Sequence, residues 1–259
     1  MSNQIHSSAI VSSQAQLGDN NVIGPFAVIE AGVQLGDGNQ IAAHTVIKRF
    51  TTMGNDNQVY EQTVIGGWPQ HLAFKDGNVQ TFCQIGDGNI FRESVTINRA
   101  YHEGQSTILG NRNFLMSTAH VAHDCVVGDE ITMASSVALA GHVTVGNKAF
   151  ISGGVMVHQF VHVGRFAMIG GNSKITQDVL PFMITDGNPA TVRGLNMVGL
   201  KRAGFSLADI STLKTAFQIL FKEGNLASNL AQLDTLEHDL ARELSAFVQA
   251  ADRGFHRNK

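Results

Sequence analysis

Histidines gather in the middle of this 259-residue sequence at a spacing that would bring them to one place. His123, Gly141 and Gln159 are eighteen residues apart, so a chain that winds in coils of that length stacks them. Their near neighbours in the sequence add further polar side chains: His120, Asp124, His142 and His158. A neutral imidazole held by a carboxylate is a good general base near neutral pH, and a glycine amide can approach an oxyanion closely. The spacing therefore indicates acid–base chemistry on a hydroxyl group, with His123 as the base, Asp124 as its orienting partner and the Gly141 amide facing the oxyanion.

Three other interpretations of these residues stay open. The histidines could be solvated surface groups, although their stacking on one edge argues against it. A metal site is a second interpretation, because His123, His142 and His158 could converge; no Asp, Glu or Cys partner has ligand-like spacing, and we expect no metal. Cys125, on the same face as His123 by strand alternation, could be a nucleophile, but direct attack by the substrate is favoured over a covalent intermediate.

The element that must position these residues is a six-residue repeat. Neither a helix nor an ordinary strand produces a strict period of six. Three such units make one coil of eighteen residues, and each coil stacks on the last at about 4.8 Å. The pattern predicts a parallel β-helix whose aliphatic residues point inward. These are Val11, Leu17, Ile23, Ile29, Leu35, Ile41, Ile47, Met53, Val59 and Ile65, then Ile85, Phe91 and Ile97, and then every sixth residue from Leu109 to Ile175.

Two segments interrupt the repeat and predict loops that leave the prism. Residues 66–84 shift its phase by two, and residues 98–108 place Glu103 at an inward position. Loops on a rigid scaffold are where binding groups tend to lie.

The repeat stops after about residue 188. Ser206 followed by Asp209 predicts the N-terminus of a helix through about Lys222, and residues 226–252 predict a second amphipathic helix. We therefore expect a β-helix catalytic domain over residues 1–188 and a helical domain over residues 189–259.

Composition excludes several classes of partner. A net charge of −3 gives no polybasic surface for nucleic acid, and no apolar run approaches the length of a membrane span. Two cysteines, Cys83 and Cys125, favour a reducing compartment over a disulfide framework. With no signal peptide at the N-terminus, we expect a cytoplasmic protein.

Seven short segments together resemble one enzyme family. They are IGPF at 23–26, RESVTI at 92–97, AHVAHDC at 119–125, LAGH at 139–142, VHQF at 157–160, GNP at 187–189 and GLKR at 199–202. The chain resembles the acyl-ACP:UDP-N-acetylglucosamine 3-O-acyltransferases, which begin lipid A synthesis. The resemblance implies a left-handed β-helix and a homotrimer with sites between adjacent prisms. It also implies transfer of a 3-hydroxyacyl chain from acyl carrier protein to the sugar 3-hydroxyl, with no cofactor beyond the acyl-phosphopantetheine of the carrier.

The resemblance also assigns roles by position. His123 would be the general base, Asp124 its orienting partner and Gly141 the oxyanion donor. Gly171 would stand at the position that limits acyl length. Substrate-binding positions would be His120, His142, His158, Gln159, Gln70, His71, Asn196 and Arg202, the last two near the nucleotide.

The departures from the family pattern concern the acceptor. The first loop reads Gln70-His71-Leu72-Ala73, where the family commonly has Gln-Asp-Leu-Lys. Asn98 replaces a frequent histidine, Val198 a usual glutamate and Ala203 a usual arginine. A charge lost at a sugar or uridine contact costs on the order of 1–3 kcal/mol. An amino-sugar nucleotide is therefore an alternative acceptor for the same donor, and a metal-dependent or scaffold β-helix protein is a further alternative.

Overall fold

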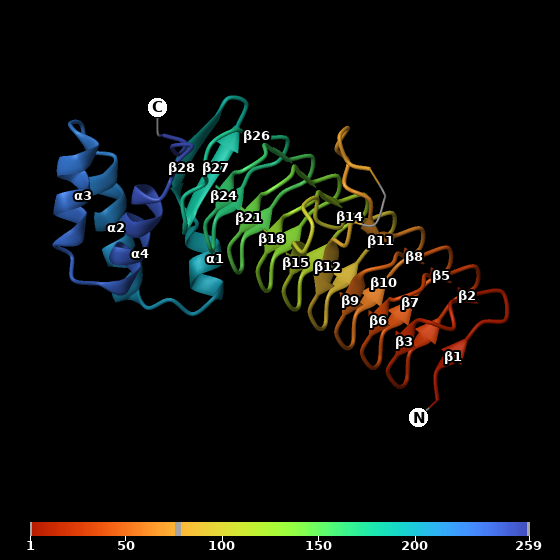
Figure 1. The fold of residues 1–259 in the computed structure, drawn as a ribbon. Helices are drawn as coiled ribbons and strands as arrows, with labels where there is room; N and C mark the ends of the chain where they lie inside the picture. Colours follow the sequence, from red (N-terminus) through yellow and green to blue (C-terminus); the bar gives the residue numbers. More distant parts are fainter. Residues whose placement is uncertain (1, 76–78, 258–259) are drawn as a thin grey trace.

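The computed structural model describes residues 2–75 and 79–257, and its first two-thirds wind as a three-sided prism (Figure 1). Three sheets form the faces, and their strands are mostly two residues long. Every coil passes once through each sheet, so residues eighteen apart are neighbours except where a loop lengthens the coil. The parallel β-helix expected from the six-residue repeat is confirmed.

The first face contains β1 (Gln4–Ile5), β4 (Val22–Ile23), β7 (Gln40–Ile41), β10 (Gln58–Val59), β13 (Ile90–Phe91), β16 (Phe114–Leu115), β19 (Thr132–Met133), β22 (Phe150–Ile151), β25 (Met168–Ile169), β27 (Met183–Gly187) and β28 (Ala190–Leu195). The second face contains β2 (Ile10–Val11), β5 (Val28–Ile29), β8 (Val46–Ile47), β11 (Val64–Gly67), β14 (Thr96–Asn98), β17 (His120–Val121), β20 (Ala138–Leu139), β23 (Met156–Val157) and β26 (Lys174–Ile175). The third face contains β3 (Gln16–Leu17), β6 (Gln34–Leu35), β9 (Thr51–Met53), β12 (Phe82–Ile85), β15 (Ser106–Leu109), β18 (Val126–Val127), β21 (Thr144–Val145) and β24 (His162–Val163).

The interior of the prism is a column of aliphatic side chains. Val145, for example, is 2% exposed and lies between Val127 and Val163 of the neighbouring coils. Cys125 is also in this column, where its Sγ donates to the Ala140 carbonyl and burial raises its pKa to about 12. The expectation that it shares a face with His123 is wrong. A second small residue of each repeat also points inward, and Cys125 occupies that position.

One edge of the prism carries a ladder of buried asparagines, here called the asparagine corner. Its members precede successive strands of the first face: Asn21, Asn39, Asn57, Asn89 and Asn113. The Oδ1 of each accepts the backbone N–H of the next, at 2.9–3.0 Å where both members are asparagine. The ladder therefore pairs most of the polar groups that this edge buries, with the Asn113 Nδ2 as an exception.

Two loops leave the regular coils where the repeat was interrupted. The first loop follows β11 and includes the described residues 68–75 and 79–81; the second loop spans residues 99–105, between β14 and β15. Glu103, which the strict period would have placed inward, is exposed in the second loop. Both predicted interruptions are confirmed.

Beyond the last coil the chain forms a hairpin and four helices. β27 and β28 pair antiparallel, so the expected boundary between residues 188 and 189 falls inside that hairpin, and the division into domains stays a prediction. The helices are α1 (Met197–Arg202), α2 (Leu207–Leu220), α3 (Leu226–Asp234) and α4 (Asp239–Gln249).

The helix ends follow local capping chemistry. Ser206 and Asp209 form a capping box at the start of α2, as predicted. The single helix expected over residues 226–252 is wrong, because it is two helices. Thr235 ends α3, and the His238 side chain accepts from the amide of Leu240 to start α4. Within the described chain, no helix has the length and apolarity needed to cross a membrane.

Candidate functional site

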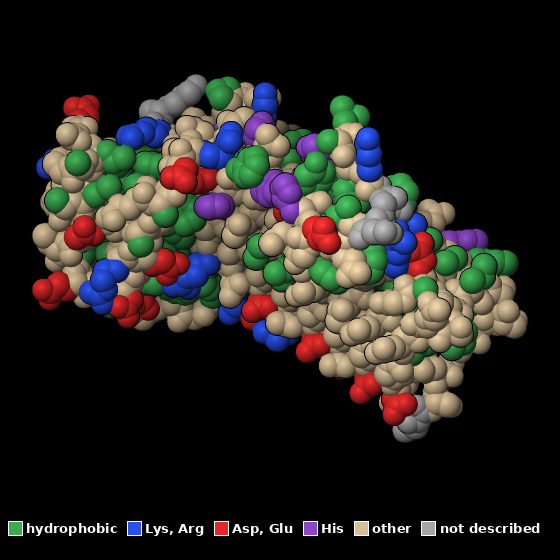
Figure 2. Space-filling view, viewed as in Figure 1, with side chains coloured by type: hydrophobic (Ala, Val, Ile, Leu, Met, Phe, Trp, Pro, Cys, Tyr) green, Lys and Arg blue, Asp and Glu red, His purple; other side chains and the backbone are tan. Residues whose placement is uncertain are grey.

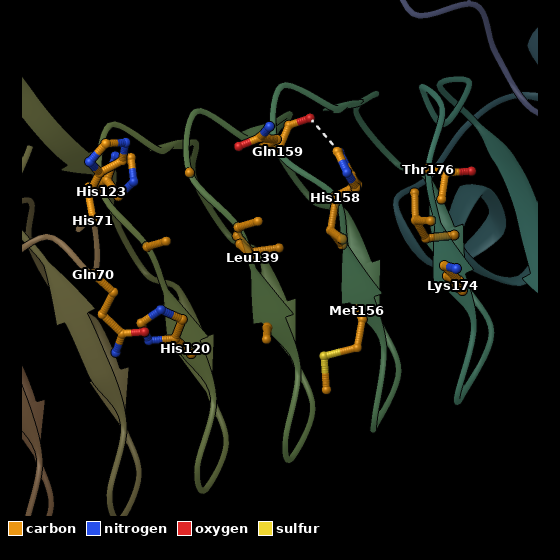
Figure 3. Close-up of a pocket in the computed structure, with 16 residues that line it drawn as sticks. Gln70, His71, His120, His123, Leu139, Met156, His158, Gln159, Lys174 and Thr176 are labelled. Carbon is orange, nitrogen blue, oxygen red and sulfur yellow. Dashed lines mark hydrogen bonds between the residues drawn. The ribbon is translucent and has the colours of Figure 1, made fainter. Parts of the chain in front are cut away.

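The histidines lie where the second face turns into the third face, an edge here called the histidine corner (residues 122–125, 140–143 and 158–161). Figure 2 shows histidine side chains gathered near the middle of the molecule. In Figure 3, His123 and Gln159 lie along one edge, with the strands that carry His120 and Met156 below them. The corner borders a pocket of about 490 Å³.

The pocket unites seven of the residues expected from the sequence: Gln70, His71, His120, His123, Gly141, His158 and Gln159. The strands position them because β17, β20, β23 and β26 are adjacent in the second face, which stacks their ends at one edge. Gln70 and His71 reach the same place from the first loop. Apolar side chains on the outside of the second face line much of the rest, among them Ala138 and Met156.

His123 and Asp124 form the tightest polar contact of the corner. The His123 Nδ1 lies 2.7 Å from the Asp124 Oδ2, and their side chains are 11% and 9% exposed. Burial raises the pKa of Asp124, but the hydrogen bonds from His123 and from the Tyr101 amide bring it below its usual value. Asp124 is therefore ionised near neutral pH and can only accept, so the His123 Nδ1–H donates and its Nε2 stays available to a substrate.

Burial of His123 differs from the exposed edge expected from the sequence. The residue is only 9% exposed. His71 from the first loop and Tyr101 from the second loop approach its ring, with centroid separations of 6.0 and 5.9 Å. The two loops thus convert an open solenoid edge into a partly closed site.

Gly141 must be glycine for His123 to occupy its position. A Cβ on Gly141 would lie 2.6 Å from the His123 Cε1 and 2.8 Å from its Nε2, closer than real contacts allow. In the described structure the Gly141 carbonyl accepts from the Phe160 amide, whereas its own N–H makes no hydrogen bond. The Gly141 amide, beside the His123 ring, is therefore free for a ligand oxygen.

The remaining histidines differ in their hydrogen bonds and in their burial. His120 is bound through Nδ1 to the Thr96 hydroxyl at 2.7 Å, and burial lowers its pKa. His158 is exposed and contacts the carbonyl of Gln159 through its Nδ1 at 3.2 Å (Figure 3). Burial also lowers the pKa of His142, although the Asp124 charge opposes this shift.

His142 lies on the other side of the corner from the first pocket. Its ring stacks on Phe160 at 4.6 Å, and its Nε2 is 3.8 Å from the Asp124 Oδ2. With Asp124 and His102 it borders a second hollow of about 630 Å³ above the third face. The His123–Asp124 pair thus stands between two hollows.

Three residues assigned by the resemblance are not in either pocket. Asn196 uses both ends of its side chain within the fold: Oδ1 caps α1 by accepting from Gly199, and Nδ2 donates to the Phe166 carbonyl. Arg202 is exposed at the end of α1. Gly171 lies at the corner between the first and second faces, where an added Cβ would meet nothing closer than 3.5 Å.

Several neighbours of His123 and Asp124 were missed from the sequence. The Tyr101 amide donates to the Asp124 Oδ2 at 3.0 Å, and the Thr107 hydroxyl accepts from the Asp124 amide at 2.8 Å. Lys174 lines the far end of the first pocket, and His102 the second. Stacking by eighteen could have found Lys174, which follows Met156 along the second face. No period predicts Tyr101 or His102, because both lie in a loop.

The expectation that no carboxylate has metal-ligand spacing is also wrong. One ligand atom from each of His123, Asp124 and His142 lies within 4.8 Å of the others, close enough to hold one cation. The left-handed backbone at the corner explains the convergence, because it turns both Asp124 (φ 60°) and His142 (φ 62°) to the same side in successive coils.

Comparisons with known proteins agree along the whole chain. The model of bacterial transferase hexapeptide repeats matches residues 14–49, and that of UDP-N-acetylglucosamine O-acyltransferase, domain 2, matches residues 178–256. The acyl-[acyl-carrier-protein]–UDP-N-acetylglucosamine O-acyltransferase of Akkermansia muciniphila is 49% identical over 97% of this chain and 98% of its own. The protein of the same name from Syntrophobacter fumaroxidans is 41% identical over 97% of this chain and 98% of its own. A match at 47% identity to the one from Synechocystis covers 61% of this chain and 56% of that protein.

Solved structures show the same fold from end to end. The UDP-N-acetylglucosamine acyltransferase of Bacteroides fragilis superposes with a TM-score of 0.94 at 34% identity, covering 98% of this chain and all of that one. The Francisella novicida enzyme gives 0.94 at 30% identity, covering 98% and 94%. The left-handed sense expected for the β-helix is therefore confirmed. The chain belongs to the acyl-[acyl-carrier-protein]–UDP-N-acetylglucosamine O-acyltransferase family, and it is an acyltransferase of lipid A synthesis.

Proposed function

We propose that this enzyme transfers a 3-hydroxyacyl chain from acyl carrier protein to the 3-hydroxyl of UDP-N-acetylglucosamine. The observation that carries the proposal is the His123–Asp124 pair at 2.7 Å beside the free Gly141 amide, at the mouth of a largely apolar pocket. A base, an oxyanion donor and an apolar surface are what acyl transfer to a hydroxyl requires.

The reaction follows from that geometry. The His123 Nε2 takes the proton of the sugar hydroxyl while the oxygen attacks the thioester carbonyl. The Gly141 amide stabilises the oxyanion of the tetrahedral intermediate. The carbon–sulfur bond then breaks, and the imidazolium returns its proton to the leaving thiolate of the carrier's phosphopantetheine. Asp124 stabilises the imidazolium and fixes its orientation. No further cofactor enters this sequence.

Cys125 is unsuited to form a covalent intermediate. Its thiol lies in the prism core, and burial raises its pKa to about 12. The nucleophile of thiol chemistry is the thiolate, which such a pKa suppresses at neutral pH. Direct attack by the substrate hydroxyl therefore remains the proposed route.

Substrate contacts are proposed from the pocket lining. The pocket in which both substrates must meet is lined by Gln70, His71, His120, His158 and Gln159. His142 borders the second hollow, on the other side of the corner. Asn196 and Arg202 are outside this pocket within one chain.

We propose that the working form is a homotrimer in which an adjacent prism supplies the second wall of the open pocket. In that arrangement the exposed Arg202 would reach the nucleotide from a neighbouring copy, and Asn196, whose side chain bonds within the fold, would lie near the nucleotide by supporting the start of α1. Sedimentation at about three times the 27.8 kDa of one chain is the expected result, and a monomer with full activity would refute it.

The acceptor is proposed to be UDP-N-acetylglucosamine despite the departures in the first loop. Relatives at 49% and 41% identity over nearly the full length are named for this acceptor. The amino-sugar alternative is not favoured. We further propose a cytoplasmic location, which the two buried free thiols, Cys83 and Cys125, favour.

The test is an assay with defined 3-hydroxyacyl carrier-protein donors and two acceptors, UDP-N-acetylglucosamine and its 3-amino analogue. The proposal expects an acylated product from the first acceptor whose acyl group is released by mild alkali, because esters are labile there and amides are not. Product formed from the amino analogue alone would identify the amino-sugar alternative. Absence of turnover with every donor would favour a scaffold.

A metal-dependent reaction is the second candidate, because His123, Asp124 and His142 converge. A cation there would have to displace the proton shared by His123 and Asp124, whose hydrogen bond already accounts for their separation. Metal analysis of the purified protein, with turnover before and after chelation, separates the two. Stoichiometric metal and loss of turnover on chelation would overturn the general-base mechanism.

A further inference from the structure

The first and second loops meet over the catalytic pair through a group of aromatic rings. The His71 and Phe74 rings lie 4.3 and 6.1 Å from the Tyr101 ring, centroid to centroid. Trp68, at the start of the first loop, lies 6.5 Å from Phe74. Tyr101 is therefore a residue of the second loop against which the first loop packs, together with Arg99, whose guanidinium lies 5.7 Å from the Phe74 ring centroid.

Tyr101 contacts the catalytic pair in two separate ways. Its backbone amide donates to the Asp124 Oδ2 at 3.0 Å, and its ring centroid lies 5.9 Å from that of His123. A change of the side chain leaves the amide in place. The effect of the ring on the first loop can therefore be separated from the effect of the amide on Asp124.

The His71 side chain has a defined hydrogen-bonding state in this arrangement. The Ala73 amide donates to the His71 Nδ1 at 3.2 Å, so that nitrogen is an acceptor. In a neutral imidazole the proton is then on Nε2. His71 lines the pocket edge-on to His123, and it thus carries an N–H donor beside the base.

We propose that Tyr101 is a positioning residue for the acceptor: its ring holds His71 so that the His71 Nε2–H reaches an oxygen of the nucleotide sugar. This inference rests on the proposed function and deepens it. The chemistry recognised is a hydroxyl, carbonyl or phosphate oxygen, because a neutral imidazole N–H donates to each of them. The Tyr101 ring restricts the His71 side chain before the acceptor binds. Less conformational entropy is therefore lost on binding.

A purely structural role for Tyr101 predicts different kinetics. A ring that only fills space would lower stability when removed, with no preference for one substrate. A ring that positions His71 affects acceptor binding and acts only while His71 is present. A double-mutant cycle between the two residues distinguishes these roles.

The kinetic experiment compares Tyr101→Leu, His71→Ala and the double variant in the full-length enzyme. We expect Tyr101→Leu to raise the KM for the nucleotide sugar about tenfold, to leave the KM for the acyl carrier protein unchanged, and to change kcat by less than about threefold. In the His71→Ala background the same change should have no further effect. An unchanged acceptor KM, or an equal increase in both backgrounds, would overturn the proposal.

Matched variants control for general effects. Tyr101→Phe keeps the ring and should retain the wild-type KM, because the described structure shows no hydrogen bond from the Tyr101 hydroxyl. Tyr60→Leu changes the only other tyrosine, which packs under Arg92 away from the pocket and should leave both KM values unchanged. If leucine lowers the Tm, Tyr101→Met repeats the cycle with a longer side chain.

A second readout does not depend on catalysis. Trp68 is the only tryptophan and is 52% exposed, so its fluorescence reports on the first loop. We expect acrylamide to quench Trp68 more strongly in Tyr101→Leu than in the wild type, and Tyr101→Phe to match the wild type. Equal quenching in all three would show that Tyr101 does not hold the loop. A wild type without turnover would refute the proposed function, while this quenching result would still decide whether Tyr101 orders the loop.

Discussion

The asparagine corner and the histidine corner are two edges of the same prism, and both stack polar side chains from coil to coil. At the asparagine corner each side chain bonds the next, as when the Asn57 Oδ1 accepts both the amide and the Nδ2 of Asn89 at 2.9 Å. At the histidine corner the shortest hydrogen bond between side chains runs within a coil, from His123 to Asp124, and the His123 Nε2 and the Gly141 amide are left for a ligand.

The difference shows how a uniform scaffold separates stability from chemistry. Polar groups that satisfy one another stabilise a buried edge, since burying them unpaired costs free energy. Polar groups left with unused donors and acceptors at a pocket can instead bind a substrate. The stacked residues, together with the two loops that cover the histidine corner, decide which of the two an edge becomes.

The largest expected effect lies in the core that both corners enclose. Val145→Asp should prevent soluble folding, because an unpaired carboxylate in the dry column costs several kcal/mol. Val145→Ala is the matched control and should still fold. Soluble expression and thermal melting measure the effect, and an aspartate variant that melts like the wild type would show that this side chain does not point inward.

A smaller effect on stability is expected at the asparagine corner. Asn57→Ala leaves the buried Asn89 amide without its acceptor and should cost about 1–3 kcal/mol. The Tm should fall by about 2–4 °C for each kcal/mol, while kcat stays near the wild-type value. Loss of turnover at an unchanged Tm would mean that this edge takes part in the chemistry.

The acyl-length prediction concerns the third edge, between the first and second faces. Gly171 has no side chain, and an added Cβ would meet its neighbours only at ordinary contact distances of 3.5 Å and beyond, so we expect a preference for longer 3-hydroxyacyl donors. Gly171→Met should shift the preference to shorter chains, because each methylene no longer buried loses about 0.8 kcal/mol. Competition between two donors on both proteins measures the shift. An unchanged ratio would mean that the acyl chain does not pass this residue.

The smallest effect is a dependence of stability on pH. Burial lowers the pKa of His120. As the pH falls below the ordinary pKa of histidine, this residue becomes protonated in the unfolded chain while it stays neutral in the folded chain. Stability should therefore decrease as the pH falls from about 7 to 5, with a slope that His120→Gln makes shallower. Melting curves across this range provide the test, and equal slopes would contradict the assigned burial effect.

The strict period made much of the molecule predictable. A repeat of six gives the inward column, and the eighteen-residue coil brings His123, Gly141 and Gln159 to one edge by spacing alone. Both loops were located from the repeat, because residues 66–84 shift its phase by two and residues 98–108 place Glu103 at an inward position.

Features that depend on local turns were not predictable in this way. Cys125 was misplaced because simple strand alternation does not hold through a corner. The break between α3 and α4 depends on capping at Thr235 and His238, which helical periodicity does not detect. The contacts of Tyr101 arise between two loops that lie outside the repeat, so no spacing in the sequence relates them.

The most direct test of the contrast between the two corners is the turnover of His123→Ala, measured together with its Tm. The imidazole bonds Asp124 and faces a pocket, so its removal should leave the coils folded and the Tm close to that of the wild type. Turnover should fall by about 10²–10⁴-fold, the usual contribution of a general base. A variant that folds normally and retains nearly the wild-type rate would contradict the assignment of His123 as the base.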